Sequence, residues 1–175
     1  MKSKSGKIAI TVMVLLFLAG IAQWYHFYPL LPESVADHFN TNGFPDSWSS
    51  KSFFLFMDIT LTLCLLLIFI GGSRLPFRLP KNVLNIPNPD HWLKDDLQVE
   101  TVVKISDYVL WIGVLSMLFV RTRFHHIYQI NSEGPPFIAN FFWLWFFVYV
   151  AVVIGFTWKF YSTFDFEAKE VLSEG

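Results

Sequence analysis

The sequence predicts an all-α integral membrane protein with four transmembrane helices and a structured extracytoplasmic loop between the first two. The composition is 54% hydrophobic, 19% aromatic and only 15% charged over 175 residues. Four long apolar runs hold most of these residues, and one soluble core of this size has too little interior to bury them. A net charge of -1 without a basic stripe argues against nucleic acid as a partner. The lipid bilayer is the predicted surrounding of a single four-span domain, residues 1–175.

The first predicted span covers residues 8–28 and contains no Lys, Arg, Asp or Glu. At about 1.5 Å per residue it is long enough to cross a hydrocarbon layer of roughly 30 Å. The lysines before it, with Gly20 and Ala22 as small residues, also fit a cleaved secretory signal. The aromatic residues from Trp24 to Tyr28 favour a retained helix anchored at the interface.

The second and third predicted spans each carry polar residues. Residues 53–72 are interrupted by one formal charge, Asp58, and end at a Gly-Gly-Ser sequence that terminates helices readily. The third span, residues 105–124, is short because Lys104 and Arg121 enclose it. Their long side chains can reach the headgroups, so the run still predicts a transmembrane helix.

The fourth predicted span, residues 137–158, is rich in aromatic residues and follows a Pro-Pro pair. Positive residues predict the direction of all four spans, because cytoplasmic loops collect Lys and Arg. Ten of the thirteen lie in the N-terminus, the loop between spans two and three, and the C-terminal tail. Only Lys51, Arg121 and Arg123 fall on the other side. Both termini are therefore expected in the cytoplasm and the loop of residues 29–52 outside.

The outer loop of residues 29–52 is too rich in turn formers and specific polar residues for a plain connector. Its aromatic residues Phe39, Phe44 and Trp48 need apolar cover, so we expect it to fold against the outer helix ends. Potential metal ligands on the same side are Glu33, Asp37, His38, Asp46, His125 and His126. They show no recognised ligand spacing, so we predict no metal and no cofactor. These polar side chains are expected to bind the loop's own backbone.

The second loop contains Asp90, His91 and Trp92 in succession. An acid beside a histidine is typical of general base catalysis, but the topology places His91 a bilayer away from His38. We therefore expect this segment to form a turn, with Trp92 at headgroup depth. The chain contains no nucleophile elbow, phosphate-binding loop or CxxC motif. No catalytic residue is assigned, and the sequence does not require an enzyme.

Asp58 is the residue that a membrane span tolerates least without a partner. The third span returns outward and brings Arg121 to a similar level, so we predict an intramembrane polar pair between Asp58 and Arg121. Lys104 and Asp107, at the opposite end, are expected to satisfy each other. The alternative is that Asp58 is protonated or reached by water. The single cysteine, Cys64, is expected to be a buried, inert thiol.

Two segments resemble a known family. Residues 31–51 resemble the domain of unknown function found in bacterial small membrane proteins and at the N-terminus of SdpI-type immunity proteins. The matching positions are Leu31, Pro32, His38, Phe39, Asn40, Gly43, Asp46, Trp48, Ser50 and Lys51. Residues 86–93 are similar to a second element of the four-span members through Pro87, Asn88, Trp92 and Leu93. The resemblance implies a bacterial cytoplasmic (inner) membrane protein and no particular activity.

Two classes of function follow from these observations. The first is a non-enzymatic binding, immunity, sensing or accessory protein that acts through its outer loop on a peptide, a lipid or a membrane-protein partner. The second is a membrane enzyme or transporter that uses Asp37, His38, Asp46 and the outer histidines.

Overall fold

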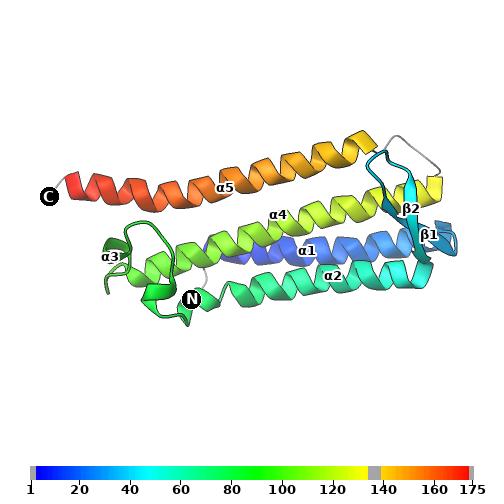
Figure 1. Cartoon of the computed structure of the whole chain (residues 1–175). Coiled ribbons are helices and arrows are strands. Elements are labelled where there is room, and N and C mark those ends of the chain that lie inside the picture. Colours follow the sequence, from blue (N-terminus) through cyan, green and yellow to red (C-terminus); the bar gives the residue numbers. More distant parts are fainter. Residues whose placement is uncertain (1–2, 134–138, 174–175) are drawn as a thin grey trace.

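The computed structural model describes residues 3–133 and 139–173. Its long helices are α1 (Lys4–Phe27), α2 (Lys51–Gly72), α4 (Gln98–Glu133) and α5 (Ala139–Ser173). Each is long and apolar enough to cross a membrane. The prediction of four transmembrane helices is therefore confirmed. The helices run side by side along the length of the molecule (Figure 1).

The shorter elements gather at the two ends of this bundle (Figure 1). One end carries a 3₁₀ turn, η1 (Tyr28–Leu30), and an antiparallel hairpin of β1 (Ser34–Phe39) and β2 (Pro45–Ser50). The other end carries two further 3₁₀ turns, η2 (Leu75–Phe77) and η3 (Lys81–Val83), and the short helix α3 (Pro89–Trp92). The start of α1 and the end of α5 also lie at the α3 end, as an even number of spans requires.

Serine residues cap the first two long helices. The Ser3 hydroxyl accepts a hydrogen bond from the Gly6 N–H at 2.9 Å, and the Ser50 hydroxyl accepts one from the Phe53 N–H at 3.3 Å. Such caps satisfy N–H groups that have no partner within the helix. Ser50 directly follows β2, so the hairpin leads into α2 without a linker.

The third helix is longer than the predicted span of residues 105–124. It starts at Gln98, where Glu100 and Lys104 form an ion pair one turn apart at 3.4 Å, and it continues to Glu133. Its last turns support the hairpin instead of ending at the membrane surface. Residues 137 and 138, the predicted start of the fourth span, lie outside the described residues.

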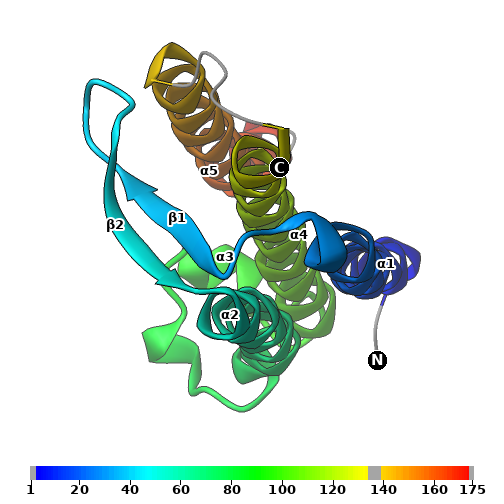
Figure 2. The same cartoon turned by 90° about the vertical axis from the view of Figure 1, so that its right-hand side faces the viewer.

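Helices α1, α2 and α4 form the packed core, as the view along the bundle shows (Figure 2). Its buried centre consists of Ala9, Met13, Leu66, Leu110, Val114 and Met117. A Cβ atom built on Gly113 would lie 2.7 Å from Phe69 and 2.8 Å from the Met13 sulfur. The absence of a side chain at Gly113 therefore lets the three helices approach closely.

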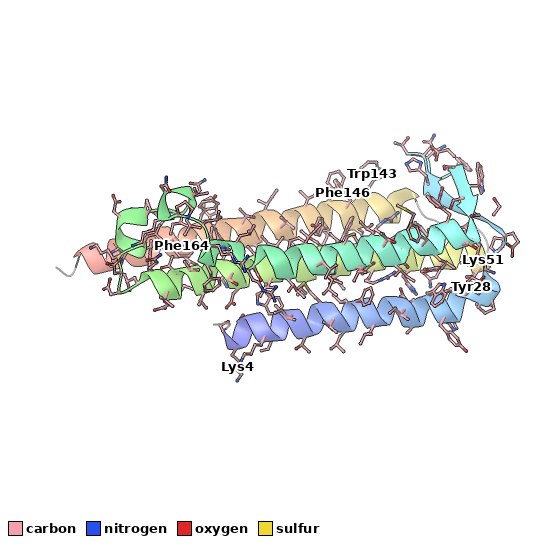
Figure 3. All side chains as sticks on the ribbon, turned by 90° about the horizontal axis from the view of Figure 1, so that it is seen from below. Lys4, Tyr28, Lys51, Trp143, Phe146 and Phe164 are labelled. Atoms are coloured by element: carbon pink, nitrogen blue, oxygen red, sulfur yellow. The ribbon has the colours of Figure 1, made fainter. Side chains whose placement is uncertain are left out.

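Helix α5 packs more loosely and mainly against α4. The rings of Phe119 and Tyr149 stack with centroids 4.5 Å apart, and the Tyr149 hydroxyl lies 3.1 Å from that of Ser116. No side chain from residue 143 to residue 163 is buried within the protein. Trp143 and Phe146 mark the hairpin end of α5 and Phe164 the opposite end (Figure 3). Most of this apolar helix surface is left for lipid to cover.

Cys64 lies exposed on the surface of α2, so the prediction of a buried thiol is wrong with respect to the protein interior. The inward face of α2 carries Phe54, Asp58, Thr62 and Leu66, which recur every four residues. Cys64 falls between two members of this series. Its side chain therefore points away from the neighbouring helices.

The α3 end is closed by Trp92, which is buried. Its indole N–H donates to the Phe164 carbonyl at 2.6 Å, and the Trp92 backbone carbonyl accepts a hydrogen bond from the Thr101 hydroxyl at 2.9 Å. Trp92 thus joins α3, α4 and α5 as a packing residue. Asn88 precedes α3 with a positive φ of 50°, a conformation that asparagine tolerates well.

Two polar contacts at this end were not predicted. Asp107 accepts a hydrogen bond from the Ser3 hydroxyl, which ties the start of α1 to α4. On the surface, the Lys81 ammonium group lies 2.9 Å from Asp95. Its hydrogen bond, assisted by its charge, lowers the pKa of the Asp95 carboxyl below the ordinary value of 3.8.

Candidate functional site

Two residues of the family-like loop, Asn40 and Gly43, form the tight turn of the hairpin. The Asn40 side-chain oxygen accepts hydrogen bonds from the N–H groups of Asn42 and Phe44 at 2.9 and 3.1 Å. Gly43 adopts a φ of 81°, which glycine reaches without strain. Next to the turn, His38 Nδ1 and an Asp46 carboxylate oxygen lie 2.5 Å apart across the strands.

Two side chains clamp the base of the hairpin to the helices. The Asn131 amide on α4 accepts from the Ala36 N–H at 2.8 Å and donates to the Ala36 carbonyl at 3.0 Å. The Lys51 ammonium group donates to the Leu31 carbonyl at 3.1 Å and lies 4.3 Å above the Tyr28 ring. Figure 3 shows Lys51 and Tyr28 close together at this end. Lys51 thus has a structural role in positioning the hairpin.

The outer part of the hairpin differs from the expectation that its aromatic residues are covered. Phe39 is half-buried, but Phe44 and Trp48 are 67% and 57% exposed. The reason is that a two-stranded ribbon has two faces and only one of them meets the helices. Pro32 lies exposed in the segment before β1.

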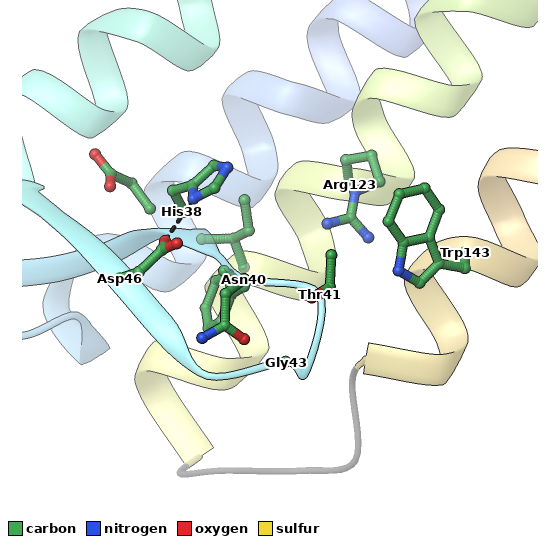
Figure 4. Close-up of a pocket in the computed structure, with 10 residues that line it drawn as sticks. His38, Asn40, Thr41, Gly43, Asp46, Arg123 and Trp143 are labelled. Carbon is green, nitrogen blue, oxygen red and sulfur yellow. Dashed lines mark hydrogen bonds and ion pairs between the residues drawn. The ribbon is translucent and has the colours of Figure 1, made fainter.

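A cavity of about 580 Å³ lies between the hairpin, α4 and α5 (Figure 4). The hairpin contributes residues 37–41 with Gly43 and Asp46, α4 contributes Arg123 and Ile127, and α5 contributes Trp143. In Figure 4 the Arg123 guanidinium group and the Trp143 ring lie beside the turn that carries Thr41. A volume of this size is typical of small-molecule sites.

The lining of this cavity combines both signs of charge with apolar surface. Asp37 and Asp46 supply carboxylates, Arg123 supplies a guanidinium group, and Trp143 with Phe39 supplies aromatic surface. One carboxylate oxygen of Asp37 is shielded from solvent and has no hydrogen-bond partner among the described residues. The cavity therefore suits a ligand that carries polar and apolar parts.

The structure describes no metal centre. Among residues 3–132 and 143–165, whose side chains the structure describes, no group of three His, Cys, Asp or Glu side chains is placed to hold an ion. His125 lies 3.1 Å from the Gln23 amide nitrogen and packs edge-on against Phe27, which directs it into the contact between α1 and α4. His91 belongs to α3, at the end of the bundle opposite His38.

A second polar site lies inside the helix bundle, where the structure brings Asp58 and Arg121 together. The two guanidinium N–H groups donate to the two carboxylate oxygens at 2.8 and 2.9 Å. The Tyr128 hydroxyl donates to Asp58 at 2.7 Å, and the Thr62 hydroxyl donates to it at 3.3 Å. Asp58 has no exposed surface and Arg121 is 6% exposed. This bidentate pair joins α2 to α4 in the low-dielectric interior.

Helix α1 leaves room for the Arg121 side chain at Gly20. A Cβ atom built on Gly20 would overlap the Arg121 guanidinium group, with the Arg121 Cζ atom at 2.9 Å. The Tyr128 ring stacks on Phe27 of α1 with centroids 5.2 Å apart. The charge pair therefore holds the relative positions of three helices, and its hydrogen bonds satisfy both oxygens of Asp58.

Sequence reasoning did not identify Thr62, Tyr128, Asn131, Arg123 or Trp143 as site residues. Two of them had a signal: Thr62 follows Asp58 by four residues and Tyr128 follows Arg121 by seven, so each shares a helix face with its charged neighbour. No sequence signal indicated Arg123 or Trp143, because they lie beside the hairpin only as a result of how α4 and α5 pack.

The fold and these sites define a multi-pass membrane protein whose hairpin roofs a cavity at one end of a helix bundle. Its residues 14–62 match the model of the family described as Domain of unknown function (DUF1648). The match spans most of α1, the hairpin and α2 as far as Thr62, and it includes Asp58. The relation to immunity proteins stays a prediction. No curated protein and no solved structure matches the chain.

Proposed function

We propose that this chain is a membrane-embedded binding protein that receives its ligand in the cavity beneath the hairpin. The observation that carries the proposal is the position of the family-like loop residues: His38, Asn40, Gly43 and Asp46 all line the cavity. The distribution of Lys and Arg supports an outward-facing cavity and cytoplasmic termini in a bacterial inner membrane. The ligand would then enter from the outer headgroup layer.

A membrane enzyme is the second candidate, and the His38–Asp46 pair favours it. A carboxylate on Nδ1 orients an imidazole so that its other nitrogen can act as a base. The side chains of His38 and Asp46 are, however, 70% and 42% exposed. Charges at such a site are screened by water, whereas effective catalysis relies on a water-excluded environment. Binding therefore fits the geometry better than chemistry does.

Site-specific photocrosslinking in cells tests the proposal. A photoreactive amino acid replaces Thr41, which lines the cavity, or Ser47, which is an exposed residue of β2 outside it. The proposal expects a discrete adduct, defined by mass spectrometry, from position 41 and little from position 47. Equal adduct yields from the two positions would contradict it.

The variant His38→Asn separates the two candidate functions. A binding protein should retain most of the adduct at position 41, because asparagine preserves the polar lining. For an enzyme, the same change should remove a base and cause the unmodified substrate to accumulate in the cavity. A chemically altered ligand that forms only with His38 present would favour the enzyme.

A further inference from the structure

We infer that the occupant of the hairpin cavity is a zwitterionic aminophospholipid such as phosphatidylethanolamine. Its headgroup would lie in the cavity and one acyl chain between α4 and α5. This inference rests on the proposed binding function and adds the chemical class of the ligand. Three observations carry it: a second cavity, the depth of Arg123 in the bundle, and the signs of the charges around Arg123.

The second cavity is an apolar groove of about 180 Å³ between α4 and α5. Its walls include Leu115, Leu118, Phe119, Trp145, Val148 and Val152. Arg123 lines this groove and also the hairpin cavity. One cation therefore stands where a polar chamber meets an apolar groove, an arrangement that matches the junction between a phosphate group and an acyl chain.

The depth of Arg123 agrees with this assignment. Asp58 lies seven residues into α2, about 10 Å below Lys51 at helical rise, and it binds Arg121 directly. Arg123 is two residues nearer the hairpin, or about 3 Å higher. Arg123 therefore lies about 7 Å below the start of α2, a depth within the roughly 5 to 10 Å that interfacial helices reach at the border between headgroups and acyl chains.

The charges select a zwitterion over a simple anion. Arg123 offers donors that suit a phosphate, but Asp37 and Asp46 on the hairpin side would repel a headgroup that is only negative. A phosphate with an ammonium group a few bonds away satisfies both signs. An ammonium group also has N–H donors for the carboxylates that line the cavity, which a trimethylammonium group lacks.

The groove argues against a peptide as the occupant of both cavities. It opens between two transmembrane helices toward the lipid, and an extended peptide there would leave backbone N–H and C=O groups unpaired in hydrocarbon. An acyl chain has no such groups. A lipid is the ligand that fills the apolar groove and the polar chamber together.

Native mass spectrometry of the purified full chain tests the inference. The protein is delipidated in detergent and mixed with phosphatidylethanolamine, phosphatidylcholine or phosphatidylglycerol of the same acyl chains. We expect phosphatidylethanolamine to be retained about tenfold better than either competitor, as one lost charge-assisted hydrogen bond predicts. Soluble phosphoethanolamine at the same concentration should not displace it, because it lacks the acyl chain.

Variants locate the bound lipid. Arg123→Gln should reduce retention about tenfold, Arg123→Lys should restore most of it, and Arg74→Gln, exposed at the opposite end, should have no effect. Val148→Trp should block the groove and reduce retention, whereas Ile154→Trp, on a part of α5 outside both cavities, should not. Thermal melting checks that each variant is folded.

The inference would be overturned by equal retention of the three lipids, or by retention that neither Arg123→Gln nor Val148→Trp changes. Displacement by soluble phosphoethanolamine would do the same, since it removes any role for the groove. These failures differ from a failure of the proposed function. A water-soluble molecule crosslinked at position 41 would refute the lipid and leave the binding function intact.

Discussion

Breaking the buried charge pair should destabilise the helix bundle, and it should do so non-additively. The perturbations are Asp58→Asn, Arg121→Gln and the double variant, which replace the charges by amides of similar shape. Each single change leaves one charge beneath the membrane surface with no opposite charge. Removing one partner of a buried pair typically costs about 3 to 5 kcal/mol.

The double variant should be much less damaged than the sum of the two single variants. Once both charges are gone, Tyr128 can still donate to the amide oxygen at position 58, since it donates to Asp58 at 2.7 Å. Thr62 keeps its 2.8 Å hydrogen bond to the backbone carbonyl of residue 58. If each single variant loses about 3 kcal/mol, the double should lose about 4. The coupling would then be about 2 kcal/mol, within the range for residues in direct contact.

Unfolding of detergent-solubilised protein measures these losses. The exposed Lys81–Asp95 pair provides the matched control, because its separation of 2.9 Å equals that of the buried pair while Asp95 is fully exposed. Asp95→Asn and Lys81→Gln should show a much smaller coupling than the buried pair, because water screens the exposed charges. If the Asp58 and Arg121 losses simply add, the ion pair does not stabilise the fold and Asp58 becomes a candidate functional acid.

Three further outcomes are expected. Gly20→Ala should displace the Arg121 guanidinium group and cost about 1 to 3 kcal/mol in thermal stability, whereas Gly155→Ala, with open space around it, should be neutral or slightly stabilising. Reporter fusions after Arg78 should indicate the cytoplasm and one near Gly43 the outside; the same side for both would refute the orientation. Lys81→Gln should raise the pKa of Asp95 toward its ordinary value of 3.8 in a carboxyl NMR titration. The stabilising effect of that pair is present above the ordinary pKa and fades as the pH falls through the lowered pKa, because protonated Asp95 no longer attracts Lys81.

The sequence was sufficient to predict the membrane helices because hydrocarbon requires long apolar runs and leaves few alternatives. The approximate positions of α1 and α2 followed directly. The helical extension before Ile105 could be predicted from Glu100 and Lys104, which lie one turn apart and form an ion pair. The extension to Glu133 could not, since it depends on the contact between Asn131 and the hairpin. Hydropathy carries no information on such extensions.

The candidate sites, too, could be predicted from the sequence only in part. An isolated carboxylate in a span needs a partner, so Asp58 directed attention to the few cations at its level, among them Arg121. The two strands were not foreseen, because a loop of polar and turn-forming residues lacks the alternating pattern of a buried strand. The cavity depends on where α5 lies beside α4, which fixes Arg123 and Trp143 relative to the hairpin. Nothing local in the sequence encodes that placement.

The buried charge pair also bears on how the chain enters the membrane during synthesis. Asp58 and Arg121 are 63 residues apart in the sequence. At about 5 to 20 residues per second, the ribosome completes Arg121 roughly 3 to 13 s after Asp58. Asp58 therefore leaves the ribosome several seconds before its counter-charge does. The strongly apolar remainder of α2 must hold the carboxyl group at the translocon until α4 arrives, so assembly of the three-helix core waits for the third span.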